Sequence, residues 1–130
     1  MPDHDRRRED RKSSALAIGV FLSHGINGLA VSPVFQGVLT SITRYGAGIA
    51  LAEVMADRTH LVYGPMESET LQLNIVFPAQ GQDSPLILSV RPVWLNKEPE
   101  NENLPPFRLG VKFLEPLPTA IFQRLNRHQH

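Results

Sequence analysis

Apolar side chains alternate with polar or small ones in several short runs along this chain. The clearest run has apolar residues at every second position, namely Leu71, Leu73, Ile75 and Phe77. A period of two places successive side chains on opposite faces of an extended strand, so this run predicts a half-buried β-strand. Similar patterns predict five further strands, at residues 15–22, 36–43, 48–54, 86–95 and 107–115.

The strands at 36–43 and 48–54 enclose the stretch that carries the most suggestive chemistry. Gly46 and Gly48 predict a tight turn with positive backbone φ between them, because glycine adopts that conformation without strain. The hydroxyls of Ser41 and Thr43 and the guanidinium of Arg44 then stand beside a rigid turn, where they can contact a ligand.

Proline and charge mark the irregular segments. Pro92 has no amide hydrogen, which predicts that strand 86–95 lies at a sheet edge or is bulged there. Residues 55–69 contain the Gly64-Pro65 breaker and predict a loop with a short extended piece at 60–63. Residues 96–106 are charged and lack an apolar pattern, so they predict a long loop.

The C-terminal pattern changes from a strand period to a helical one. Pro118 suits the first turn of a helix, and Leu117, Ile121 and Leu125 share one apolar face. This helix is expected to pack against the sheet and cover one end of it. Six closely spaced strands and one terminal helix predict an all-β fold, a six-stranded antiparallel β-barrel formed by residues 15–130.

Residues 1–14 are almost wholly polar, and five of the residues between 6 and 12 are basic. Such a segment buries too little apolar surface to order itself, so it predicts a mobile arm. Arg7 and Arg11 form an R-x-x-x-R pattern with Arg8 between them. The ordinary interpretation of such an arm is a solvated tail, and the alternative is an anion-binding arm.

Composition narrows the possible functions. The chain has 130 residues, 42% of them hydrophobic, a formal charge of zero and no cysteine, which fits one soluble domain without disulfides. No apolar run reaches the length of a membrane-spanning helix, and we expect a cytoplasmic protein. Zero net charge does not favour nucleic-acid binding, and aromatic residues are not interleaved with basic ones as single-strand binding requires.

The five histidines do not predict an enzyme. His4, His128 and His130 lie near the termini, while His24 and His60 fall in separate predicted loops and are expected to be exposed. None has metal-ligand spacing or an acidic partner beside it, so we expect no catalytic residue, metal or cofactor. Phe35 and Tyr45 could stack on a base, but barrel aromatics more often lie in the core.

Three motifs in this order resemble those of the bacterial PilZ domain. The first is the Arg7–Arg11 pair, and the second is Ser41-Ile42-Thr43-Arg44-Tyr45-Gly46, a degenerate form of [D/N]-x-S-x-x-G. The third is a closing R-x-G-V-x-F in the last strand, made by Arg108, Gly110, Val111 and Phe113. Trp94, which precedes that strand, also fits the family, and the resemblance covers the chain except for the loops at 55–69 and 96–106.

The resemblance implies a small barrel that senses cyclic di-GMP and signals to a partner protein. It implies ligand contacts from seven residues: Arg7, Arg8, Arg11, Ser41, Thr43, Arg44 and Gly46. Arginine suits such a ligand, because its planar donors match phosphate oxygens and the O6 and N7 acceptors of guanine. Ser41 replaces the family's Asp or Asn, however, and the lost acceptor leaves an alternative open. That alternative is a PilZ-like adaptor that binds proteins and no nucleotide.

Overall fold

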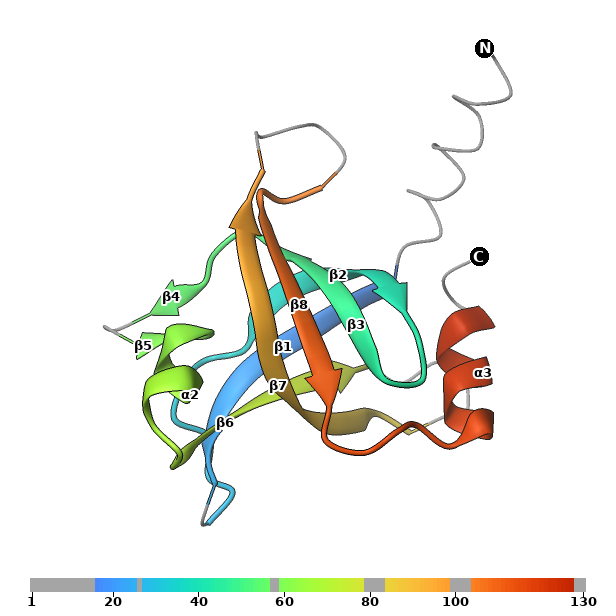
Figure 1. Cartoon of the computed structure of the whole chain (residues 1–130), viewed down its shortest axis with the longest axis horizontal. Coiled ribbons are helices and arrows are strands. Elements are labelled where there is room, and N and C mark those ends of the chain that lie inside the picture. The colour runs from blue at the N-terminus through green and yellow to red at the C-terminus, as the bar shows by residue number, and fades with distance from the viewer. Residues whose placement is uncertain (1–15, 26, 57–58, 79–83, 99–103, 128–130) are drawn as a thin grey trace.

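Six antiparallel strands close into a barrel in this computed structural model, which describes residues 16–25, 27–56, 59–78, 84–98 and 104–127. Their order around the barrel is β1-β2-β3-β8-β7-β6 (Figure 1). The strands are β1 (Leu16–His24), β2 (Phe35–Ile42), β3 (Gly46–Leu51), β6 (Leu71–Phe77), β7 (Leu86–Lys97) and β8 (Phe107–Phe113). The predicted all-β, six-stranded antiparallel barrel is therefore confirmed, with strand ends shifted by a few residues.

The alternating pattern of each strand explains which side chains form the core. In β1 the residues Leu16, Ile18, Val20 and Leu22 are all buried, and so are Leu73, Ile75 and Phe77 in β6. These two strands thus direct every second side chain into the barrel, where burial of apolar surface stabilises the fold.

The C-terminal helix α3 (Thr119–Arg127) forms as predicted and lies at one end of the barrel (Figure 1). Leu125 on α3 and Leu117 just before it are buried in the same hydrophobic cluster as the barrel interior. Ile121 is half-buried against that cluster. The helix is therefore held by its apolar face.

The segment between β3 and β6 differs from the prediction of a loop with an extended piece at 60–63. It contains a two-stranded sheet of β4 (Met55–Ala56) and β5 (Thr59–His60), followed by the short helix α2 (Tyr63–Glu67). Pro65 does not break α2 because it lies in the first turn, where the missing amide hydrogen removes no helical bond. Leu61 and Val62 just before α2 are buried, which fixes the helix on the barrel.

The barrel seam between β6 and β7 is paired over only part of its length. Their register runs from Phe77↔Leu86 to Leu73↔Val90, after which β6 continues along β1 and β7 along β8. The Gln72 side chain bridges the point of divergence, because its Nε2 donates to the Val90 carbonyl at 2.8 Å. The helix α2 contacts both strands beside this opening.

Strand β7 is irregular where the proline predicted it. The β7–β8 register shifts between Pro92 and Trp94, which is the signature of a bulge or similar irregularity. The prediction that this strand is bulged near Pro92 is confirmed. The predicted arm at 1–14 and part of the predicted 96–106 loop, residues 99–103, lie outside the described residues.

Candidate functional site

The β2–β3 hairpin turns at Arg44 and Tyr45, and β3 begins at Gly46, two residues earlier than expected. The Thr43 amide donates to the Gly46 carbonyl at 2.9 Å and closes the turn. The Thr43 Oγ1 accepts from the amides of Tyr45 at 3.1 Å and Gly46 at 3.2 Å. The hydroxyl of Thr43, predicted to bind ligand, is therefore engaged in shaping the turn itself.

The predicted reason for the two glycines is wrong. Both Gly46 and Gly48 lie in strand β3, and the positive-φ glycine in the described structure is Gly28. Close approach explains them instead. A Cβ at Gly46 would collide with the Val111 carbonyl, and one at Gly48 would lie 2.8 Å from the hydroxyls of both Thr40 and Ser41.

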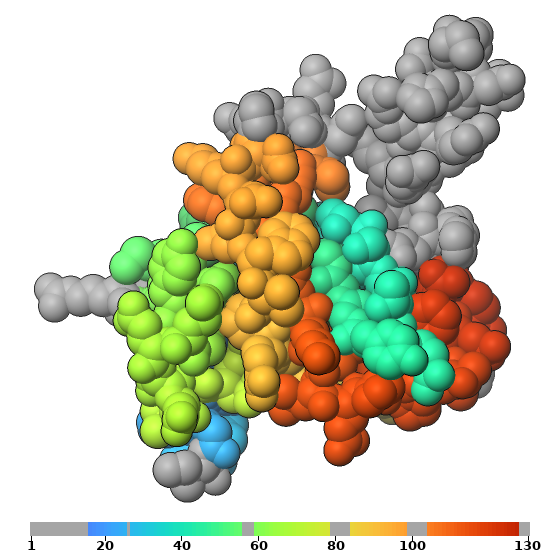
Figure 2. All heavy atoms as spheres, in the orientation of Figure 1, coloured from blue at the N-terminus to red at the C-terminus, as the bar shows by residue number. Residues whose placement is uncertain are grey.

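A row of four residues crosses the outer face of the barrel next to this hairpin. Ser41 of β2 pairs with Gly48 of β3, which pairs with Gly110 of β8, which pairs with Trp94 of β7. Figure 2 shows this side of the barrel, with β7 in light orange and β2 and β3 in turquoise. We call these four residues the outer row.

The two glycines of the outer row let the side chains at its ends lean inward. The indole of Trp94 lies against Gly110, where a Cβ would collide with the ring, and 48% of the residue remains exposed. The Ser41 hydroxyl lies over Gly48 on the next strand. Because neighbouring strands are about 4.8 Å apart, an aromatic surface and a hydroxyl are brought close together here.

Basic residues flank the outer row. Lys112 of β8 and Arg91 of β7 are paired in the row nearer the hairpin turn, and Arg108 of β8 lies in the row beyond. Strands β2, β3, β7 and β8 contain no acidic residue within their bounds. The basic residues on these strands favour an anionic ligand, although Glu98 and Glu115 lie just beyond the ends of β7 and β8.

The remaining predicted residues are distributed unevenly around this face. Ser41 is exposed, as a contact residue must be. Arg44 is also exposed, but its Nε donates to the Leu117 carbonyl at 2.9 Å, so it faces the start of the C-terminal segment. Gly46 has a structural role against β8. Phe35 is buried as expected, whereas Tyr45 is 60% exposed at the hairpin tip, so the expectation that it lies in the core is wrong.

Arg7, Arg8 and Arg11 lie outside the described residues, but the point where their segment joins the barrel is defined. Leu16, the first residue of β1, pairs with Leu39, two positions before Ser41. An extended chain covers at most about 3.6 Å per residue, so Arg11 can reach up to about 18 Å from Leu16. The Ser41 end of the outer row is thus within this distance of Leu16.

The sequence patterns did not predict the aromatic surface at this site. Trp94 fits the family resemblance, but the sequence does not show that it pairs with Gly110, which leaves its indole partly exposed.

The two internal histidines lie away from this site, and the expectation that they are exposed in loops is wrong. His24 ends β1 and His60 lies in β5, both are half-buried, and the His60 Nδ1 accepts from the Val62 amide at 3.0 Å.

Among the described residues, no group of three or more His, Cys, Asp or Glu side chains is arranged to hold a metal ion. His4, His128 and His130 are not among the residues described. Within the same part of the chain, the helices are too short or too polar to cross a bilayer.

Comparison of the chain with protein-family models, with curated proteins and with solved structures finds no match.

Proposed function

We propose that this protein is a PilZ-type sensor that binds cyclic di-GMP on the outer row and passes the signal to a partner protein. The observation that carries the proposal is the outer row itself, which joins an exposed indole, two glycines and a hydroxyl across four adjacent strands. One guanine stacks on Trp94, and the Ser41 hydroxyl contacts a polar edge of the ligand. Stacking of a base on an aromatic side chain contributes about 1–3 kcal/mol.

Basic side chains supply the remaining contacts, to the phosphates and guanine edges of cyclic di-GMP. Arg91, Arg108 and Lys112 surround the outer row, and the R-x-x-x-R pair of Arg7 and Arg11 is attached to the chain close to Ser41. Arginine binds phosphate and the guanine O6 and N7 acceptors through paired hydrogen bonds. The arm, with Arg8 between the two arginines, closes over a ligand that already lies on the barrel.

The alternative function is a PilZ-like adaptor without nucleotide, and a specific observation favours it. Thr43 and Arg44, two of the seven residues that the family resemblance implies, have hydrogen-bond partners within the protein. Ser41 also lacks the acceptor strength of the family's Asp or Asn. Both hypotheses require a protein partner, and they differ in whether nucleotide binds.

The test uses the fluorescence of Trp94, which is the chain's single tryptophan. Titration of the full chain with cyclic di-GMP is expected to quench this signal saturably, with matching heat in calorimetry. Cyclic di-AMP, in which adenine lacks the O6 acceptor, is expected to bind more weakly. The absence of heat and quenching at high micromolar cyclic di-GMP would reject the sensor and leave the adaptor.

A pair of arginine variants tests the role of the arm. Arg11→Ala is expected to weaken binding by about tenfold or more, the loss of one charge-assisted hydrogen bond, without lowering the melting temperature. Arg127→Ala is the matched control, because Arg127 is an exposed cation in the last turn of α3. Equal affinities of Arg7→Ala, Arg11→Ala and wild type would show that the arm is only a solvated tail.

A further inference from the structure

A groove lies on the barrel surface where β6 and β7 diverge, next to α2. Its volume is about 530 Å³. Figure 2 shows α2 in green beside β7 in light orange on this face. The groove is lined mainly by Met66, Glu69, Leu71, Arg91, Pro92 and Leu114. None of these residues belongs to the outer row, but Arg91 also flanks that row, so the groove borders the proposed nucleotide site.

Two of the large apolar side chains that line this groove are exposed. Met66 on α2 is 63% exposed, and Leu114, just after β8, is 52% exposed. Leu71 and Pro92 between them are half-buried. Two exposed apolar residues on opposite sides of a groove mark a surface that gains free energy when a partner covers it.

The two sides of the groove carry opposite charge. Arg91 lies on the β7 side and is paired across the sheet with Lys112, which adds positive charge there. Glu69, between α2 and β6, lies on the other side. In the described part of the chain neither Arg91 nor Glu69 has an ion-pair partner, so both charges remain available for complementary groups on a ligand.

The shape of β7 decides which kind of polypeptide fits. Beyond Val90 this strand has a neighbour on its β8 side only, so its other edge could in principle pair with an added strand. Pro92 removes a backbone donor from that edge, and the register shift between Pro92 and Trp94 distorts it. Both features are known to prevent edge pairing. Recognition in the groove therefore depends on side chains rather than on strand addition.

We propose that this groove docks an amphipathic helix of a partner protein. The apolar stripe of that helix, at i, i+3 or i+4 and i+7, packs between Met66 and Leu114. Acidic side chains flank the stripe on the Arg91 side, and basic ones flank it on the Glu69 side. The inference is argued from the groove and is tested without nucleotide, because Arg91 lies between the groove and the outer row.

The experiment selects ligands without assuming a partner. A displayed library of fully random 16-residue peptides is panned on the full chain without nucleotide and counter-selected on the Met66→Glu variant. Enriched peptides are expected to be helical, apolar on one stripe, acidic on one flank and basic on the other. Their affinity is expected to fall about tenfold or more in Met66→Glu and Leu114→Asp.

Two further variants test whether the selected peptides bind in the groove itself. Ile87→Glu is the matched control, because Ile87 is 58% exposed on β7 but does not line the groove, and it is expected to bind as wild type. Arg91→Glu is expected to lower the affinity for peptides with an acidic flank. The affinity is expected to be restored when the acidic residues of that flank are replaced by basic ones. Melting curves establish that all four variants are folded.

Three outcomes would overturn the proposal. One is a panning experiment in which no sequence is enriched over the counter-selected variant. Another is enrichment of extended or proline-rich sequences, which would indicate a different binding mode. The third is a dimer of the chain itself, seen by sedimentation in wild type and lost in Met66→Glu, which would assign the groove to a second copy.

Discussion

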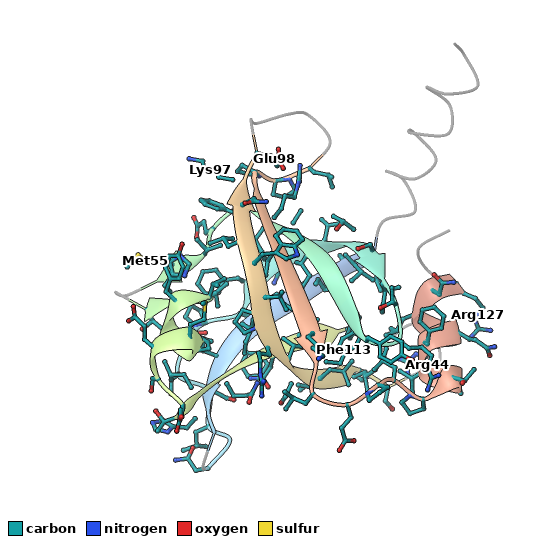
Figure 3. The ribbon with its side chains drawn as sticks, viewed as in Figure 1. Arg44, Met55, Lys97, Glu98, Phe113 and Arg127 are labelled. Carbon is teal, nitrogen blue, oxygen red and sulfur yellow. The ribbon has the colours of Figure 1, made fainter. Side chains whose placement is uncertain are left out.

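Arg44 and Leu117 are joined by two hydrogen bonds that run in opposite directions. The Leu117 amide donates to the Arg44 carbonyl at 2.8 Å, and the Arg44 Nε donates to the Leu117 carbonyl at 2.9 Å. Figure 3 shows Arg44 at the end of the barrel beside α3. The tip of the β2–β3 hairpin therefore holds the segment that leads into the C-terminal helix.

The first prediction follows from this pairing. Arg44→Ala removes one of the two bonds, and a hydrogen bond from a charged donor at a partly buried position contributes about 1–2 kcal/mol. The variant is expected to lose about that much free energy of unfolding, measured by urea denaturation. Tyr45→Ser, at the exposed neighbouring position, is the control and is expected to change stability by less than about 0.5 kcal/mol.

The affinity of the Arg44 variant for nucleotide separates a structural role from a binding role. If Arg44 only anchors the hairpin, Arg44→Ala binds cyclic di-GMP nearly as wild type once the protein is folded. A variant that is as stable as wild type but binds cyclic di-GMP much more weakly would contradict this interpretation. It would indicate that Arg44 contacts the ligand.

The second prediction compares two glycines that are required for different reasons. Gly46→Ala forces a methyl group against the Val111 backbone, which cannot move without displacing β8, and overpacking of this kind costs about 1–3 kcal/mol. Gly28→Ala meets no atom within 4 Å but strains a backbone at φ 73°, at a cost of about 1–2 kcal/mol. Thermal denaturation of both variants is expected to show a loss of stability in each.

A further readout distinguishes the two causes. Hydrogen exchange of the β3–β8 amides is expected to accelerate in Gly46→Ala and to remain as in wild type in Gly28→Ala. Unchanged exchange along β3 and β8 in Gly46→Ala would show that the strands accommodate a Cβ, contrary to the close approach described above.

The third prediction concerns pH and His60. The ring Nδ1 accepts from the amides of Val62 at 3.0 Å and Tyr63 at 3.1 Å, and the ring stacks on Tyr63 with centroids 4.3 Å apart. Burial lowers the pKa of His60 below its ordinary value of 6.5. Protonation also turns Nδ1 into a donor, which removes the acceptor that these two amides require at the start of α2.

The sign of the effect follows from the direction of the shift. Because the unfolded chain binds this proton more readily, the stabilisation by neutral His60 is complete above about pH 6.5 and decreases as the pH falls through the lowered pKa. His60→Asn keeps an acceptor at a helix N-terminus without titrating. Its free energy of unfolding is expected to fall less than that of wild type between pH 7 and pH 5. If the free energies of the two proteins fall in parallel with pH, protonation of His60 is not the cause.

The barrel was predictable because apolar residues alternate clearly in several of its strands, above all in β1 and β6. Leu71 to Phe77 was assigned to its residues correctly, since a period of two with a buried face leaves little freedom in register. Helix α2 was not predictable, because Gly64 and Pro65 suggest a break and only the buried pair Leu61 and Val62 holds the turn against the barrel. A helix of five residues is stabilised by tertiary packing, which local propensity does not report.

The candidate site was predictable only in part. The motif marks Ser41 as a candidate, but the relation of Ser41 to Trp94 depends on the register of three strand pairs and cannot be predicted from sequence spacing. The part that Thr43 plays in the turn and the close packing of Gly46 against β8 were not predictable for a similar reason, since a motif does not show what its residues contact inside the protein.

The last prediction uses the position at which the family motif is degenerate. Ser41 is exposed at the end of the outer row, and the four strands around it carry no acidic group of their own. Ser41→Asp restores a charged acceptor for a guanine N–H or for an arginine of the arm. Affinity for cyclic di-GMP is expected to rise by about ten- to a hundredfold, the worth of one charge-assisted hydrogen bond of about 1.5–3 kcal/mol.

Gln36→Asp provides the matched control, because Gln36 is exposed on the same strand but pairs with Gly19 on β1, away from the hairpin. It adds the same charge to β2 and is expected to leave nucleotide affinity unchanged or slightly weaker. Aspartate is disfavoured in strands by up to about 1 kcal/mol, so the stability of both variants is measured with their affinity. If Ser41→Asp is folded and binds no better than Gln36→Asp, position 41 does not contact the ligand, and the adaptor becomes the better hypothesis.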